Sequence, residues 1–167
     1  MAKIATLGTY LYQAGLAFGL LIFVSNRLPS AEFTAYSLFV STTQFAAIAC
    51  FEWIRFACSR FYPGPDAASE AAERSALHHE FLACCLICLV AAALTPLLGV
   101  TWAVAGAGLL AVIGQAGTEL HLTMLRFRQD FRLFSWLQAA RATLMAIGTI
   151  AGALVGRDLL HVLAGMM

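Results

Sequence analysis

Charged residues are scarce in this chain of 167 residues: Asp, Glu, Lys and Arg together make up 11% of it, against 61% for hydrophobic residues. Since an ordinary soluble domain carries roughly 25% charged residues, this shortage excludes a water-soluble fold. The formal net charge of +1 also lacks the basic excess with which proteins bind phosphate backbones. We therefore expect no nucleic-acid partner.

Metal-ligating and catalytic patterns are also lacking. The five cysteines, at positions 50, 58, 84, 85 and 88, are odd in number and lie in or beside apolar segments, so we expect small packing residues rather than disulfides. His78 and His79 are adjacent and point to different faces of a helix, and we expect no metal and no cofactor. No nucleophile with a paired base, phosphate-binding glycine loop or carboxylate dyad stands out, so no enzymatic activity is expected.

Long apolar runs occupy most of the chain. A helix needs about 20 apolar residues to cross a bilayer. Five runs reach about that length and a sixth does not; they are residues 4–24, 31–59, 81–100, 102–125 and 131–155, with a partial run at 159–167. We predict an all-α, polytopic membrane helix bundle with about five complete transmembrane helices and a partial sixth, cut off inside a helix. The first run lacks a cleavage site and is interpreted as a retained span.

Polar and helix-breaking residues suggest where these helices begin and end. Ser30 is a candidate N-cap, with Glu32 in the first turn of the second helix. Residues 61–65 (FYPGP) should end that helix, and residues 66–80 should form a solvated connecting helix. Pro96 falls inside the third run, where packed neighbours can satisfy the freed backbone groups.

Basic residues are unequally distributed between the two sides of the predicted spans. One side carries most of them: Lys3, Arg55, Arg60, Arg74, Arg126, Arg128 and Arg132. The other side carries Arg27 and Arg157, while Arg141 lies within the fifth run. The positive-inside rule then predicts a multi-pass protein of the inner (cytoplasmic) membrane with a cytoplasmic N-terminus.

Four charged residues fall within the predicted spans: Glu52, Arg55, Glu119 and Arg141. Arg141 follows the basic link by about ten residues, which at about 1.5 Å per residue places it near the midplane. Such residues are costly in a bilayer and often face a cavity. One interpretation is a polar substrate cavity, with three glutamines as further hydrogen-bonding positions: Gln44, Gln115 and Gln138. The other is structural, with Glu52 and Arg55 paired locally or snorkelling and Glu119 supporting Arg141.

Three stretches resemble one family of transporters. Residues 28–38 (LPSAEFTAYSL) resemble the start of the second helix in polysaccharide-type flippases. Residues 53–56 (WIRF) and 59–62 (SRFY) are similar to the cytoplasmic end of that helix, and residues 126–132 resemble the basic link between helices four and five. The family comprises the Wzx-type transporters of lipid-linked oligosaccharide, within the multidrug/oligosaccharidyl-lipid/polysaccharide export superfamily.

The resemblance implies a role in polysaccharide biosynthesis. Family members have about twelve to fourteen helices in two lobes that alternate access to a central cavity. It implies membrane lipid and a lipid-linked saccharide as partners, with Arg55 and Arg141 suited by type to its diphosphate. This chain would supply the first lobe incompletely, and a second chain or a C-terminal lobe would complete it.

Two other functions remain open, beside a truncated product without activity. The first is a cation-coupled exporter of small amphipathic cations, in which Glu52 and Glu119 would matter more than the arginines. The second is a non-transporting membrane scaffold. Its helix-associating glycines would be Gly8, Gly15, Gly19, Gly106, Gly108, Gly114 and Gly117.

Overall fold

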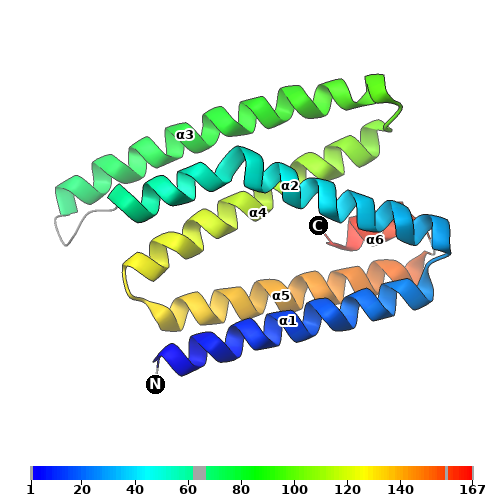
Figure 1. Ribbon diagram of the computed structural model, residues 1–167, viewed down its shortest axis with the longest axis horizontal. Helices are drawn as coiled ribbons and strands as arrows, with labels where there is room; N and C mark the ends of the chain where they lie inside the picture. Colours follow the sequence, from blue (N-terminus) through cyan, green and yellow to red (C-terminus); the bar gives the residue numbers. More distant parts are fainter. Residues whose placement is uncertain (1, 62–66, 157, 167) are drawn as a thin grey trace. The chain divides into compact units, whose positions relative to one another are not determined.

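The computed structural model describes residues 2–61, 67–156 and 158–166. All regular structure in these ranges is helical: α1 (Ala2–Arg27), α2 (Ser30–Phe61), α3 (Ala67–Leu94), the 3₁₀ turn η1 (Thr95–Leu98), α4 (Trp102–Phe127), α5 (Phe131–Val155) and α6 (Leu159–Met166) (Figure 1). Helices α1 to α5 are each long and apolar enough to cross a membrane. The predicted all-α membrane bundle is therefore confirmed, and the short α6 matches the partial sixth run.

The chain forms two compact units. The first contains Met1–Ser41 and Asp130–Met167, and the second contains Thr42–Gln129. Helix α2 contributes its N-terminal part to the first unit and the remainder to the second. Each unit has its own buried apolar cluster.

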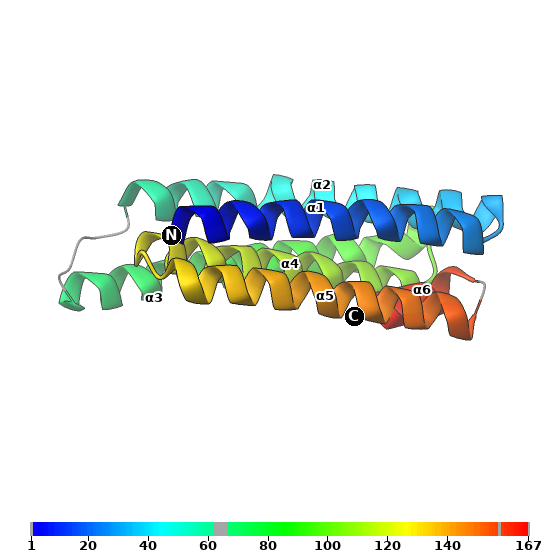
Figure 2. The same cartoon turned by 90° about the horizontal axis from the view of Figure 1, so that it is seen from below.

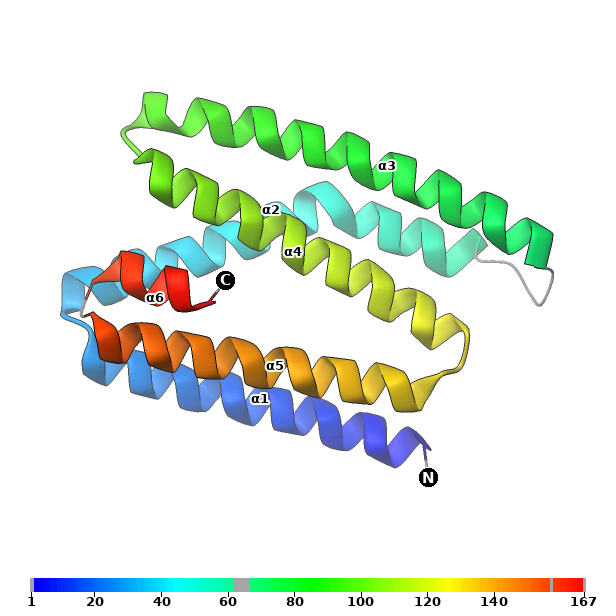
Figure 3. The same cartoon turned by 180° about the vertical axis from the view of Figure 1, so that it is seen from behind.

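In the first unit, α1 lies alongside α5 (Figures 1 and 2). Helix α6 turns back beside the C-terminal half of α5 (Figure 3). The buried cluster joins three helices through Val24 and Leu28 of the α1 end, Ala153 of α5 and Val162 of α6. Side chains from the start of α2, including Tyr36, pack against it. Apolar packing thus gathers four helix ends in one place.

Glycines bring α5 and α6 into backbone contact. Gly148 and Gly152 are four residues apart, so they lie on one face of α5, and Gly156 follows the end of the helix. A Cβ atom added at Gly152 would lie 2.2 Å from the carbonyl oxygen of His161, and one at Gly148 would lie 1.8 Å from that of Gly165. No side chain fits at either position. This close approach is the small-residue packing that helices use inside membranes.

Most glycines named in the sequence analysis, unlike Gly148 and Gly152, lie in open space. A Cβ atom at Gly8, Gly15 or Gly19 of α1 would meet nothing within 4 Å, and the same holds for Gly106 and Gly114 of α4. In the first unit, the glycines that contact a partner helix are Gly148 and Gly152 of α5, which the sequence analysis did not predict.

The carboxylate of Glu32 links α2 to α6. Glu32 lies in the first turn of α2, as predicted. Its Oε2 atom accepts a hydrogen bond of 2.8 Å from the backbone N–H of Leu159, the first residue of α6. The first N–H groups of a helix lack partners within the helix and carry partial positive charge. Glu32 therefore satisfies and neutralises the start of this short helix.

The second unit has a core built by three helices. Helix α2 contributes buried residues at intervals of three and four, and α4 does so at intervals of four, which places each set on one helix face. The cluster comprises Ala47, Phe51, Ile54, Cys58, Cys84, Cys88, Val112, Ala116, Leu120 and Met124. Cys50 and Cys85 pack at its margin, and all five cysteines are free thiols. Their prediction as apolar packing residues is confirmed.

Two predicted boundaries are wrong. Helix α3 runs without a break from Ala67 to Leu94, so the connecting helix and the third span are one helix, and it ends before Pro96 in a 3₁₀ turn closed by Gly99 at φ 85°. Proline disfavours the helical conformation of its preceding residue, which explains this end. Ser30 is not the N-cap, because the carbonyl of Pro29 already accepts the first helical hydrogen bond, from Phe33 at 2.9 Å. Residues 62–66 lie outside the described ranges.

We expect Gly152→Ala to weaken the docking of α6, because the added methyl group meets backbone atoms that cannot move aside. Overpacking of this kind costs about 1–3 kcal/mol. Thermal unfolding in detergent, followed by circular dichroism, and protease sensitivity of α6 measure the loss. The matched control is Gly106→Ala, which adds its methyl group in open space. Equal melting temperatures for both variants would contradict the packing account.

Candidate functional site

Glu52 and Arg55 form an ion pair inside the α2 span. The Nη1 atom of Arg55 donates to Oε2 of Glu52 at 2.8 Å, and the two side chains are 34% and 30% exposed, Arg55 first. The residues are three apart and so share one face of the helix. The predicted local pair is confirmed.

The pair leaves part of the Arg55 guanidinium unsatisfied. Its Nε atom is buried and has no hydrogen-bond partner among the described residues. A buried donor without an acceptor costs about 1–3 kcal/mol, so this position is unfavourable unless an acceptor arrives. Guanidinium groups bind phosphate and carboxylate oxygens through several N–H groups at once. Arg55 therefore carries a buried donor without an acceptor, while its Nη1 atom is held by Glu52.

The remaining predicted site residues divide between the two units. On α4, Gln115 and Glu119 are half-buried and four apart on one face, whereas Gln44 of α2 is exposed. These three belong to the second unit with Glu52 and Arg55, while Gln138 and Arg141 belong to the first. Local spacing thus places Gln115 beside Glu119 and Gln138 beside Arg141.

Hydrogen bonds between side chains join α1 to α5. Gln138 is buried, and its Nε2 atom donates to Oε1 of Gln13 at 2.6 Å. The hydroxyl groups of Tyr12 and Thr143 are 2.8 Å apart. We call these four residues the polar seam. The sequence analysis missed Gln13 and Tyr12, although a glutamine within an apolar span is itself a pointer to a polar partner.

Arg141 lies next to the polar seam. It is half-buried and follows Gln138 by three residues, so both lie on the same face of α5. The hydrogen bond between Gln13 and Gln138 therefore orients this face of α5, which includes Arg141, toward α1. An arginine within an apolar span is costly and is therefore a candidate for function.

The histidines have local roles. The Nδ1 atoms of His78 and His79 are hydrogen-bonded to the carbonyl oxygens of Arg74 and Ser75, at 2.6 and 2.7 Å, within their own helix. Among the described residues, no three His, Cys, Asp or Glu side chains gather closely enough to hold a metal ion.

Comparison with known proteins does not assign this chain to a family. No family model, curated protein or solved structure matches this chain.

The hydrogen bond between Gln13 and Gln138 should appear as coupling in a double-mutant cycle. We expect Gln13→Leu and Gln138→Leu to destabilise the first unit less than additively when combined, with a coupling of about 0.5–2 kcal/mol. Detergent-induced unfolding of the two single variants and the double variant measures it. The exposed Gln44→Leu is the control and should be near neutral. Strict additivity of the two seam variants would show that the amides do not interact.

Proposed function

We propose that this protein is part of a membrane transporter that moves a lipid-linked saccharide precursor across the cytoplasmic membrane. The observation that carries the proposal is Arg55, a half-buried arginine in a membrane-spanning helix whose buried Nε atom has no acceptor among the described residues. A lipid diphosphate would supply acceptor oxygens to such a donor. The resemblance of residues 28–38, 53–56, 59–62 and 126–132 to polysaccharide flippases supports the same cargo.

Arg141 supports an anionic cargo from the other unit. Arginine stays charged at all relevant pH values, and a charge kept within an apolar span requires a compensating role. Gln44 and Gln115 would offer both donors and acceptors to sugar hydroxyls, whereas Gln138 is already bonded to Gln13. Within each unit, these groups suit phosphate and saccharide better than apolar chains.

The arginine-rich ends of the spans also support an orientation. Arg55, Arg60 and Arg74 lie at the junction of α2 and α3, and further arginines follow the end of α4. Under the positive-inside rule these ends, and the N-terminus with them, would face the cytoplasm, where lipid-linked precursors are loaded.

The two other candidate functions have weaker support. In an amphipathic-cation exporter, Glu52 would have to attract the cargo, but its carboxylate is already paired with Arg55 at 2.8 Å. In a scaffold, the glycines of α1 and α4 would be the contact surface. A Cβ atom at Gly8, Gly15, Gly19, Gly106 or Gly114 would meet nothing within 4 Å, so these positions are open, but they carry no side chain that selects a partner. In an anion transporter, the Nε atom of Arg55, which lacks an acceptor among the described residues, would contact the cargo.

Binding of a short-chain polyprenyl diphosphate to the protein in detergent tests the proposal. We expect Arg55→Gln to bind at least tenfold more weakly, because a hydrogen bond to a charged group contributes about 1.5–3 kcal/mol. Glu52→Gln should bind as tightly as the wild type or more tightly, since it removes a competing carboxylate.

The matched control is Arg132→Gln, which removes an exposed arginine at the start of α5. It should leave the affinity within about twofold, since exposed charge pairs contribute little. Equal losses in Arg55→Gln and Arg132→Gln would show that only overall charge matters and would contradict the proposed site.

A further inference from the structure

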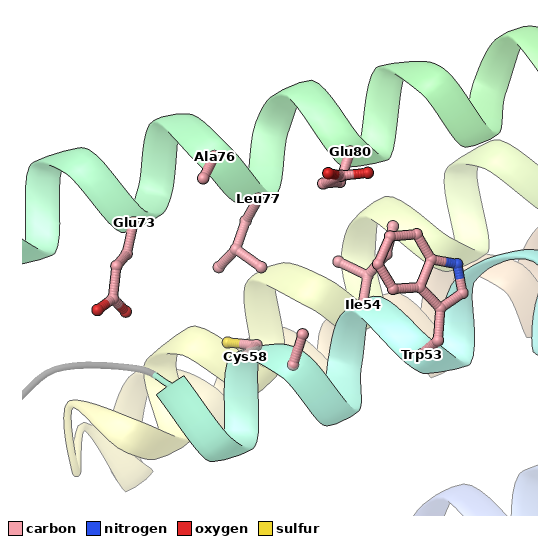
Figure 4. Close-up of a pocket in the computed structure, with 8 residues that line it drawn as sticks. Trp53, Ile54, Cys58, Glu73, Ala76, Leu77 and Glu80 are labelled. Atoms are coloured by element: carbon pink, nitrogen blue, oxygen red, sulfur yellow. The ribbon is translucent and has the colours of Figure 1, made fainter.

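A pocket of about 240 Å³ lies between α2 and α3, within the second unit (Figure 4). The residues around it include Trp53, Ile54 and Cys58 of α2 and Glu73, Leu77 and Glu80 of α3. None of the residues predicted for a substrate cavity lines it. The pocket is therefore a separate feature of the molecule.

The middle of the pocket is apolar. Ile54 and Cys58 are almost completely buried, and Leu77, which packs against the same buried cluster, projects toward them from α3 (Figure 4). Such walls favour hydrocarbon, because a polar group placed between them would lose its water without gaining a partner. An occupant of the pocket therefore has an apolar middle.

A carboxylate stands at each end of this apolar middle. Glu73 lies at the Cys58 end and Glu80 lies at the Trp53 end (Figure 4). The two glutamates are seven residues apart, which places them on one face of α3 about 10 Å apart along the helix axis. Neither carboxylate has a salt-bridge partner among the side chains that the structure describes. One cationic group cannot contact both carboxylates, so the two ends suit two separate cationic groups.

An aromatic ring adds to one of the two ends. The indole Nε1 of Trp53 donates to the carbonyl oxygen of Cys50 at 3.0 Å, which fixes the ring, while 47% of the residue remains exposed. This ring lies beside Glu80 (Figure 4). The face of an indole ring attracts cations, so the ring and the carboxylate favour the same kind of group.

The α3 wall of the pocket lies outside the uncharged part of its span. The span, Ala71–Leu98, has 28 residues and is therefore about 42 Å long, which exceeds the roughly 30 Å of bilayer hydrocarbon. Its uncharged part begins at Phe81, and Glu73, Arg74 and Glu80 all precede it. Glu73 is half-buried and Glu80 is exposed. A water-soluble cation therefore reaches this wall without crossing hydrocarbon.

We propose that this pocket binds a linear diamine with an ammonium group at each end. One ammonium donates hydrogen bonds to Glu73, the other donates to Glu80 and faces Trp53, and the methylene chain contacts Ile54 and Leu77. A monoamine would pair with one carboxylate only, and a single metal ion could not bridge carboxylates at the two ends. This site does not depend on the proposed transport of a lipid-linked saccharide.

Isothermal titration calorimetry of the purified protein in a non-ionic detergent, with the heat of the detergent alone subtracted, tests the proposal. We expect 1,8-diaminooctane to bind about fivefold more tightly than octylamine, which has one ammonium group, because the second ammonium gains a carboxylate. It should exceed 1,3-diaminopropane similarly, since that chain is too short to reach both ends. All three ligands are compared on the wild-type protein, so no effect on folding enters.

Substitution of either carboxylate tests the two ends separately. Glu73→Gln and Glu80→Gln should each abolish the preference for 1,8-diaminooctane over octylamine, because one ammonium loses its partner. Asp158→Asn, which neutralises an exposed carboxylate of the first unit, is the matched control and should keep the preference. Equal wild-type affinity for both ligands, a preference that survives both glutamate substitutions, or its equal loss in Asp158→Asn would each overturn the proposal.

Discussion

Inside a bilayer every backbone N–H and C=O must find a partner within the chain, because no water replaces a lost hydrogen bond. This constraint accounts for the uniformly helical structure of the described residues and for the treatment of helix ends. The Pro29 carbonyl closes the first turn of α2, and the Glu32 carboxylate serves α6. Hydroxyl groups within spans follow the same rule, since Thr143 and Thr149 donate to carbonyls one turn earlier, at 2.8 and 2.7 Å. Against this background, three buried atoms of the described residues lack a partner: the Nε atoms of Arg27 and Arg55 and the hydroxyl of Ser135.

Helix association needs other forces, since lipid is as apolar as the side chains it would replace. The first unit uses backbone contact at Gly148 and Gly152 and the amide pair of Gln13 and Gln138. The second unit uses small and sulfur-containing side chains, among them Cys58, at intervals that keep them on one face. Packing therefore uses these polar and small residues within each unit. Those it does not use are the strongest candidates for binding.

Local sequence rules predicted much of this structure. Apolar runs gave the five spans, and a spacing of three gave the ion pair of Glu52 with Arg55. Contacts between distant residues could not be predicted: Glu32 and Leu159 are separated by 127 positions, and Gln13 and Gln138 by 125. The spacing of the glycines shows which face of a helix lacks side chains. It does not show against which of these faces another helix packs. The α2–α3 pocket was missed for the same reason, because it needs two helices in register.

Reporter fusions that distinguish the two sides of the membrane would test the central claim, that α1 to α5 each cross the bilayer. The reporters would follow residues 28, 64, 100, 129 and 156, one after each span. The account predicts strict alternation, with the fusions after 64 and 129 on the side of the N-terminus and the other three opposite. Two successive fusions on the same side would show that the intervening helix does not cross, and would remove the charged residues of that helix from the membrane interior.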